Sequence, residues 1–240
     1  MINYKIININ DFPRRDHLEY FMSMEQPHVN ITVEVDVTDW QKFCKREGVP
    51  FFLGFVHIVA QSAESIPEFR QRIHLLTDEE LLMPEHAGYR MADGKAYELR
   101  EYEECPTSHT ESTSDERYCY CPLRHHMPFD EYIAVARRQQ AEARALGSLE
   151  EDKEIEAFFF PTCVPWLRYT DVVHPMTDRF DSNPRFSWCK YAEDFRGRLM
   201  MPLTVAAHHG LVDGIHIAKF YENVEKNMNS IARHGNSGPF

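Results

Sequence analysis

The stretch MPLTVAAHHGLVDGIH, residues 201–216, decides the fold of this chain. Its apolar first part predicts a strand over roughly 200–207, and that strand runs directly into His208 and His209. After Gly214, apolar residues recur at helical spacing and predict an amphipathic helix. The apolar face of that helix consists of Ile217, Phe220, Tyr221, Val224, Met228 and Ile231. The stretch is therefore a strand, a tight turn and a helix, with two histidines at the turn.

This turn is suited to acid–base chemistry. A rigid strand can project a side chain into a cleft, and an imidazole near neutrality can accept a proton from an alcohol. Asp213 can fix the turn by pairing with an arginine, and Gly214 lets the backbone bend tightly. Taken alone, HHGLVDG is explained more simply by two packed histidines beside a turn aspartate. Its meaning depends on the rest of the chain.

Further strands and helices are predicted around this unit. Residues 29–37 alternate between apolar and polar side chains and predict a half-buried strand. Asp130 is a candidate helix N-cap, and Gly48 and Gly147 are placed to end helices. The pattern predicts three more helices, at about 39–48, 51–66 and 130–146. Short strands with loops are predicted over 74–122, and two strands joined by EDFRGR over 186–207.

These elements indicate one α+β domain, a mixed β-sheet flanked by helices. Strands and helices are mixed without a regular βαβ alternation, which argues against a doubly wound parallel sheet. No repeat and no long linker divides the chain. We expect a single domain over residues 1–232 and a C-terminal tail at 233–240.

Charge and composition exclude several classes of partner. The chain has 26 basic and 38 acidic residues, a net charge of −12, so nucleic acid and anionic membranes would be repelled. No apolar run reaches the roughly 20 residues that span a bilayer, and the first residues do not resemble a signal peptide. The six cysteines are expected to be thiols, and a cytoplasmic location is predicted.

Several separated motifs resemble the chloramphenicol acetyltransferase family, of the type A enzymes with an HHxxxDG signature. FPRRDHLEYF at 12–21 is similar to the family's W-x-R-x-x-H-F segment, and IPEFR at 66–70 to the end of a family helix. TCVPW at 162–166 resembles S-x-x-P-W, and FSWCKY at 186–191 resembles T-M-x-K-Y. The matches run in the family's order from about Tyr4 to Lys226 and imply the CoA-dependent acyltransferase fold.

The resemblance implies a catalytic set. His209 would be the general base that deprotonates the acceptor hydroxyl, which attacks acetyl-CoA directly without an acyl-enzyme. Thr162 stands where the family has a serine whose hydroxyl stabilises the oxyanion. Asp213 and Arg14 would form a structural ion pair that holds the loop carrying His209. Acetyl-CoA is the implied co-substrate, and no metal is expected.

The resemblance also implies residues that bind the two substrates. Trp166 and Tyr191 would line the pantetheine channel, although simple core packing is an equal alternative for both. Lys190 would approach a phosphate of CoA, and Ser187 stands where the family has a threonine near the acceptor.

The acceptor pocket differs from the family's pattern. Phe21, Glu25 and Val29 occupy the positions of a tyrosine, an apolar residue and a phenylalanine that pack on chloramphenicol. A carboxylate buried unpaired at position 25 would be costly. The acceptor is therefore chloramphenicol or a related small molecule, or else a different hydroxyl or amine with a positive or strongly polar group.

The family assembles as a trimer with each active site between two subunits, so a homotrimer is implied here. A small-molecule acceptor is the other expected partner. Two alternatives remain: an acyltransferase of the same fold with another acceptor, or a noncatalytic oligomeric scaffold. The complete set of His209, Asp213 and Arg14 argues against the scaffold, which has no need of a general base.

The remaining cysteines and histidines allow one metal hypothesis. Residues 105–126 contain Cys105, His109, Cys119, Cys121, His125 and His126. Such density is compatible with zinc, but C-x-C is not the usual zinc motif, and two same-facing cysteines on a strand are more often small core residues. His17, His57 and His208 are predicted to be structural.

Overall fold

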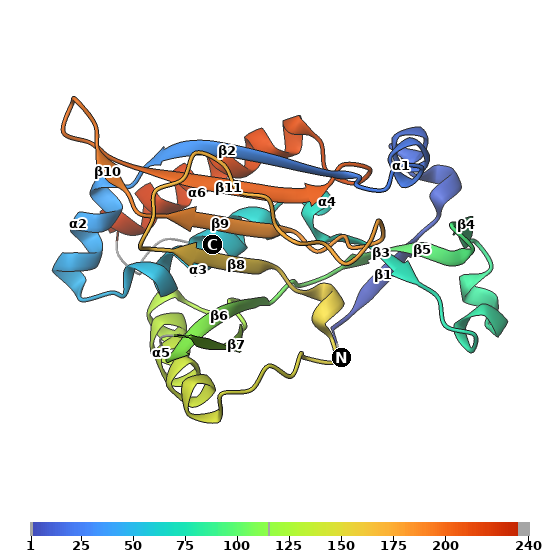
Figure 1. The fold of residues 1–240 in the computed structure, drawn as a ribbon, viewed down its shortest axis with the longest axis horizontal. Helices are drawn as coiled ribbons and strands as arrows, with labels where there is room; N and C mark the ends of the chain where they lie inside the picture. Colours follow the sequence, from blue (N-terminus) through green and yellow to red (C-terminus); the bar gives the residue numbers. More distant parts are fainter. Residues whose placement is uncertain (1, 115, 235–240) are drawn as a thin grey trace.

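The computed structural model describes residues 2–114 and 116–234 (Figure 1). Of the predicted tail, residues 235–240 lie outside the described residues, and the last helix, α6, spans Gly214–His234. All six cysteines are free, as predicted. Among the described residues, no helix is both long and apolar enough to cross a membrane.

The largest sheet is built around its longest strand, β11. This strand lies between β2 and β9, pairs briefly with β10 at its start, and is antiparallel to all three, whereas β8 is parallel to β9 at the far edge. Figure 1 shows β2, β11, β9 and β8 side by side. The strands are β2 (His28–Asp36), β8 (Phe160–Val164), β9 (Arg185–Cys189), β10 (Ala192–Glu193) and β11 (Leu199–His208).

Two smaller sheets flank the large one. In the first, β5 pairs with β1, β3 and β4, always antiparallel, and in the second β6 and β7 form a hairpin. Their bounds are β1 (Tyr4–Ile7), β3 (Gln71–Leu75), β4 (Arg90–Ala92), β5 (Lys95–Tyr102), β6 (Thr107–Ser114) and β7 (Arg117–Leu123). The predicted α+β class with a mixed sheet is confirmed.

Helices cover one face of the large sheet. Figure 1 shows α6 and α3 behind it, and the predicted apolar face of α6, from Ile217 to Ile231, is buried there. The connection between β8 and β9 crosses the other face, where Asp171 and His174 bond to strand residues. Besides α6, the α-helices of the described residues are α1 (Arg15–Met22), α2 (Thr38–Glu47), α3 (Phe51–Glu64), α4 (Pro67–Arg70) and α5 (Phe129–Leu146).

Helix ends follow the predicted glycines but not the predicted cap. Gly48 and Gly147 have φ of +66° and +64° and end α2 and α5 in the left-handed conformation. The prediction that Asp130 caps α5 is wrong, because the helix already begins at Phe129 after the extended Pro128. Asp130 lies in the first turn instead, where its charge favours the helix dipole.

A substitution at Gly54 tests whether the cost of overpacking outweighs the gain in helix propensity. A Cβ at this position of α3 would lie 2.7 Å from Cζ2 of Trp40, whose side chain is buried. We expect Gly54→Ala to lower the free energy of unfolding by about 1–2 kcal/mol, because the cost of overpacking exceeds the roughly 1 kcal/mol that alanine gains in helix propensity. Chemical denaturation measures the difference. Ala141→Gly, on the exposed side of α5, reports propensity alone, and a Gly54→Ala protein that is more stable than wild type contradicts the prediction.

Candidate active site

His209 directly follows β11 and is held by backbone hydrogen bonds. Its amide N–H donates to the carbonyl of Pro27 at 2.8 Å, and its Nδ1 lies 3.1 Å from the carbonyl oxygen of Val212. A carbonyl only accepts, so Nδ1 carries the proton that makes this bond. The neutral ring therefore keeps its lone pair on Nε2, which is the tautomer a general base needs.

Phe21 fixes the plane of the His209 ring. The two rings are stacked, with centroids 4.2 Å apart and an interplanar angle of 27°. Phe21 comes from α1, which is distant in sequence but close to the end of β11 (Figure 1). The predicted acceptor-site residue Phe21 thus directly contacts the predicted base, which is half-buried.

Arg14 joins the two ends of the turn. Its guanidinium donates to Oδ2 of Asp213 at 2.9 Å and to the carbonyl oxygen of His209 at 3.0 Å. The other oxygen of Asp213 accepts the amide of Gly214 at 2.6 Å. The hydrogen bond from Arg14 is the main cause that lowers the pKa of Asp213 below its usual value. The structure therefore brings together all three residues of the predicted ion pair and base.

His208 has a structural role, as predicted. It is buried, its Nδ1 accepts the amide of Gly210 at 3.1 Å, and its Nε2 donates to the carbonyl of Arg179 at 3.1 Å. Burial lowers its pKa to about 3, so the ring is neutral near pH 7. Both nitrogens of His208 are engaged in hydrogen bonds, so His209 is the histidine of the pair that suits the role of base. His57 is buried within α3, and His17 is exposed on α1.

Thr162 and Ser187 belong to a row of hydroxyl groups across the large sheet. The strand register aligns Thr162 with Ser187, Ser187 with Thr204, and Thr204 with Thr32. The hydroxyls of Thr204 and Thr32 are 2.7 Å apart, and that of Ser187 lies 2.9 Å from Nε2 of His174. Burial lowers the pKa of His174. Sequence reasoning missed Thr204 and Thr32, because only strand pairing reveals the row, and it missed His174, which reaches the row from the β8–β9 connection.

Within one chain, Thr162 does not meet His209. Thr162 is aligned with Thr204 two strands away, and His209 lies five residues beyond Thr204. With strands about 4.8 Å apart and a rise of about 3.3 Å per residue, the two residues are roughly 19 Å apart. A single subunit therefore does not place the predicted base and the predicted oxyanion donor in one site.

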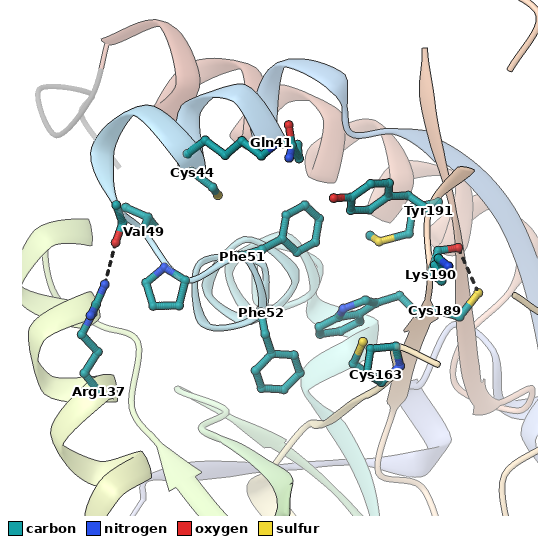
Figure 2. Close-up of a pocket in the computed structure, with 16 residues that line it drawn as sticks. Gln41, Cys44, Val49, Phe51, Phe52, Arg137, Cys163, Cys189, Lys190 and Tyr191 are labelled. Atoms are coloured by element: carbon teal, nitrogen blue, oxygen red, sulfur yellow. Dashed lines mark hydrogen bonds between the residues drawn. The ribbon is translucent and has the colours of Figure 1, made fainter. Parts of the chain in front are cut away.

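A cavity of about 760 Å³ lies between α2, the start of α3 and the end of β9. Figure 2 shows the rings of Phe51, Phe52 and Tyr191 around it, with Lys190 beside Tyr191. Lys45 and Arg137 also line it, and Arg137 donates to the carbonyl of Gly48 at 2.6 Å. An apolar hollow with several cations suits a long thiol chain that ends in phosphates. Of the predicted CoA residues, Lys190 and Tyr191 lie here.

Trp166 lies outside the lining of this cavity and is 78% exposed, so core packing does not explain it within one chain. Its neighbour Pro165 does line the cavity. Sequence reasoning missed Phe51, Phe52, Lys45 and Arg137. These residues lie far from the resemblance motifs, and only their helix positions bring them to the cavity.

A second cavity, of about 500 Å³, is polar and contains Glu25 together with Asn30 and His174. Glu25 is exposed, so its carboxylate carries no burial cost within the chain. The Oδ1 atom of Asn30 is buried and has no hydrogen-bond partner in the described part of the chain. Val29 is half-buried on β2 and packs against the core. A third cavity, of about 280 Å³, adjoins the second at His174 and contains Thr162.

Comparisons with known proteins agree with this geometry. A family profile described as chloramphenicol acetyltransferase matches residues 2–225. A chloramphenicol acetyltransferase of Klebsiella sp is 25% identical over 225 residues, 93% of each chain, and chloramphenicol acetyltransferase 3 of Escherichia coli is 21% identical over 234 residues, 95% of this chain and 99% of the other.

Solved structures share the fold. A chloramphenicol acetyltransferase superposes with a TM-score of 0.74 at 23% identity, covering 94% of this chain and 100% of the other. A dihydrolipoamide acetyltransferase of Azotobacter vinelandii gives a TM-score of 0.59 at 16% identity, covering 90% and 86%. The profile match over nearly the whole chain, together with the His209 turn, shows that the chain is an acetyltransferase and belongs to the chloramphenicol acetyltransferase family.

Proposed function

We propose that the protein transfers the acetyl group of acetyl-CoA to a hydroxyl of a small acceptor, chloramphenicol or a related molecule, with His209 as general base. The observation that carries the proposal is the hydrogen bond from Nδ1 of His209 to the carbonyl of Val212, at 3.1 Å. It leaves Nε2 unprotonated on a ring that Phe21 holds in place. Such a nitrogen takes the proton of the acceptor hydroxyl as that oxygen attacks.

The transfer then proceeds in one attack. The acceptor oxygen bonds to the thioester carbonyl carbon while its proton moves to Nε2 of His209. The resulting oxyanion accepts a hydrogen bond from the hydroxyl of Thr162. When the carbon–sulfur bond breaks, His209 returns the proton to the leaving sulfur, so the products are the acetyl ester and CoA thiol. Arg14 and Asp213 are positioning residues, because they contact the turn and not the reacting atoms.

The cavity of about 760 Å³ suits acetyl-CoA. We place the pantetheine chain against Tyr191 and Phe51, and a phosphate near Lys190, with Trp166 closing the channel from the surface. Six free thiols favour a reducing compartment, so we propose a cytoplasmic location.

We propose that the active form is a homotrimer with its active sites between subunits. The separation of roughly 19 Å between His209 and Thr162 supports this, because direct attack requires both groups at one carbonyl. Exposed apolar side chains in the β8–β9 connection also support it, since large exposed apolar groups mark interfaces. They are Trp166, Leu167 and Val173, which are 78%, 63% and 73% exposed.

A more polar acceptor is the second candidate. The cavity that holds Glu25 contains the unpartnered Oδ1 of Asn30 and the imidazole of His174. These groups favour an acceptor that carries hydrogen-bond donors or a positive charge, because unpaired buried acceptors cost free energy. The noncatalytic scaffold is disfavoured by the intact turn of His209, Arg14 and Asp213.

The first test is release of CoA thiol from acetyl-CoA, with and without chloramphenicol. We expect acceptor-dependent release, and His209→Ala should reduce kcat by about 10²- to 10⁴-fold, the usual effect of losing a general base. Circular dichroism confirms that the variant is folded. An unchanged rate in His209→Ala contradicts the assigned base. If acetyl-CoA binds but chloramphenicol triggers no release, the acceptor is one of the polar molecules above, and a panel of amino alcohols identifies it.

Loss of the Arg14–Asp213 pair should affect the position of the base. We expect Arg14→Met and Asp213→Asn to lower kcat by about 10- to 100-fold with little change in KM for acetyl-CoA, because a small displacement of a catalytic group is costly. Arg14→Lys can restore one contact but not both, so it should recover only part of the activity. If Arg14→Lys and Arg14→Met lose equal amounts of kcat, the positive charge at position 14 does not contribute to activity. A change confined to KM would show that the pair binds substrate instead.

Mixed trimers test the shared site. His209→Ala and Thr162→Val each inactivate the pure protein in this proposal, the second by about 10²- to 10³-fold. If each site takes its base from one subunit and its oxyanion donor from the next, co-expression in equal amounts restores about one quarter of wild-type activity. Sedimentation should give three times the chain mass. No recovery in hybrid trimers, or monomers at micromolar concentration, contradicts the intersubunit site.

A further inference from the structure

Three metal-ligating side chains meet where the end of α3 approaches the loop between β7 and α5. Glu64 is the last residue of α3, and His125 and His126 lie between β7 and α5. One ligand atom from each of the three lies within 4.8 Å of the others. This is the one group of three or more such residues found in residues 2–114 and 116–234. None of them belongs to the proposed catalytic set.

Glu64 directs one oxygen at both histidines. Its Oε1 accepts the amide of Cys105 at 2.6 Å, which fixes the carboxylate. Its Oε2 lies 3.1 Å from Nε2 of His125 and also contacts Nε2 of His126. Two imidazole nitrogens and a carboxylate oxygen therefore converge from two segments of the chain, the end of α3 and the loop before α5.

The other ring nitrogen of His126, Nδ1, contacts a second carboxylate, that of Glu104. This Nδ1 lies 3.2 Å from Oε2 of Glu104, and Arg124 donates to Oε1 of Glu104 at 2.6 Å. A carboxylate on Nδ1 holds a proton there, as it does for histidines that bind metals. Nε2 then faces the carboxylate of Glu64 with a lone pair, and two lone pairs repel unless a cation or a second proton lies between them.

His125 is held by packing. Its side chain is 2% exposed, and its ring stands edge-on to that of His126, with centroids 4.8 Å apart at 84°. Its Nδ1 is buried and has no hydrogen-bond partner among the described residues, so Nε2 is the atom through which it binds. In a tetrahedral zinc site with bonds of 2.0–2.1 Å, ligand atoms are about 3.3 Å apart. The distance of 3.1 Å between Nε2 of His125 and Oε2 of Glu64 is close to that edge.

We propose that Glu64, His125 and His126 bind a Zn²⁺ ion. Two imidazoles and one carboxylate are a common three-residue zinc set, and water completes the fourth position. The side chain of His126 is 42% exposed, so water reaches the ion from that side. Glu104 is the outer partner that orients His126.

This ligand set differs from the cysteine-based hypothesis. Cys119 and Cys121 do face the same way, but both are buried under α5, and burial raises the pKa of Cys121 to about 12. Burial likewise raises the pKa of Cys105 to about 12. Thiols that stay protonated are poor zinc ligands. His109 is engaged by Glu111 at 2.8 Å. Only the two histidines at the end of the segment remain.

The ion would join the end of α3 to the loop that precedes α5. Both helices line the cavity proposed for acetyl-CoA, α3 through Phe51 and Phe52 and α5 through Arg137. Zinc therefore acts on stability through the scaffold of that cavity and takes no part in acetyl transfer.

Calorimetric titration of chelator-stripped protein with zinc chloride tests the site. We expect one equivalent to bind with micromolar or lower Kd, and the Tm to rise by about 5 °C at a hundredfold excess over Kd. His126→Ala should abolish tight binding, and Glu104→Gln should weaken it by about 10- to 100-fold. Because His126 is partly exposed, its variant should fold, and the absence of zinc binding can be assigned to the lost ligand.

Two controls separate this site from others. His17→Ala removes an exposed histidine elsewhere and should bind zinc like wild type, as should the double variant Cys119→Ser/Cys121→Ser. Co²⁺ should give the visible bands of a tetrahedral complex without thiolate charge-transfer bands. Less than about 0.2 equivalents of bound zinc overturns the proposal, and a second proton on His126 then holds the cluster together. Equal binding of zinc by wild type and His126→Ala also overturns it.

Discussion

The antiparallel pairing of β11 with β2 is the constraint on which the rest of the structure depends. The pairing extends over nine residues, from Met200 opposite Asp36 to His208 opposite His28. Side chains alternate between the two faces of a strand. A shift of the pairing by one residue would therefore move each buried side chain of β11 to the opposite face of the sheet. In the observed register His208 enters the interior, and His209 emerges at the turn beside α1. Backbone hydrogen bonds along the whole strand thus decide which of the two histidines is available as the proposed base.

The turn beyond that strand is held at several points by different kinds of interaction. Arg14 links Asp213 to the carbonyl of His209, and Gly210 fits where a Cβ would lie 2.9 Å from the ring of His208. These contacts keep the His209 ring in one orientation before any substrate binds. Groups held in advance lose little entropy during the reaction, which is the physical advantage of building a base on a strand end.

The same register places polar side chains in two separate regions of the chain. It aligns the hydroxyls of Thr162, Ser187, Thr204 and Thr32 in a row that lies far from His209. The polar cavities beside this row hold Glu25, Asn30 and His174, while the apolar cavity lies near Tyr191. One chain therefore holds His209 and Thr162 in separate places, which supports the proposal that active sites are shared between subunits.

The sequence by itself determined the elements whose signals are local. Alternation over 29–37, helical spacing after Gly214, and the left-handed glycines Gly48 and Gly147 all act within a few residues, and all are observed. The motif at 208–214 supplied the proposed base and Asp213, whereas the observed pairing of Asp213 with Arg14, 199 residues away, was predicted only through the resemblance to the family. The prediction that Asp130 is the N-cap was wrong by two residues, since the extended Pro128 precedes a helix that begins at Phe129.

Only the tertiary structure decided which distant residues meet. The stacking of Phe21 on His209, the row of hydroxyls and the cluster of Glu64 with His125 and His126 join segments far apart in sequence. The cysteines of 105–126 had the density of a metal site, but the β6–β7 hairpin turns Cys119 and Cys121 into the core under α5 and leaves the histidines at its end beside Glu64. Strand register and helix packing set these contacts, and both depend on burial and hydrogen bonding summed over the whole chain rather than on any local pattern.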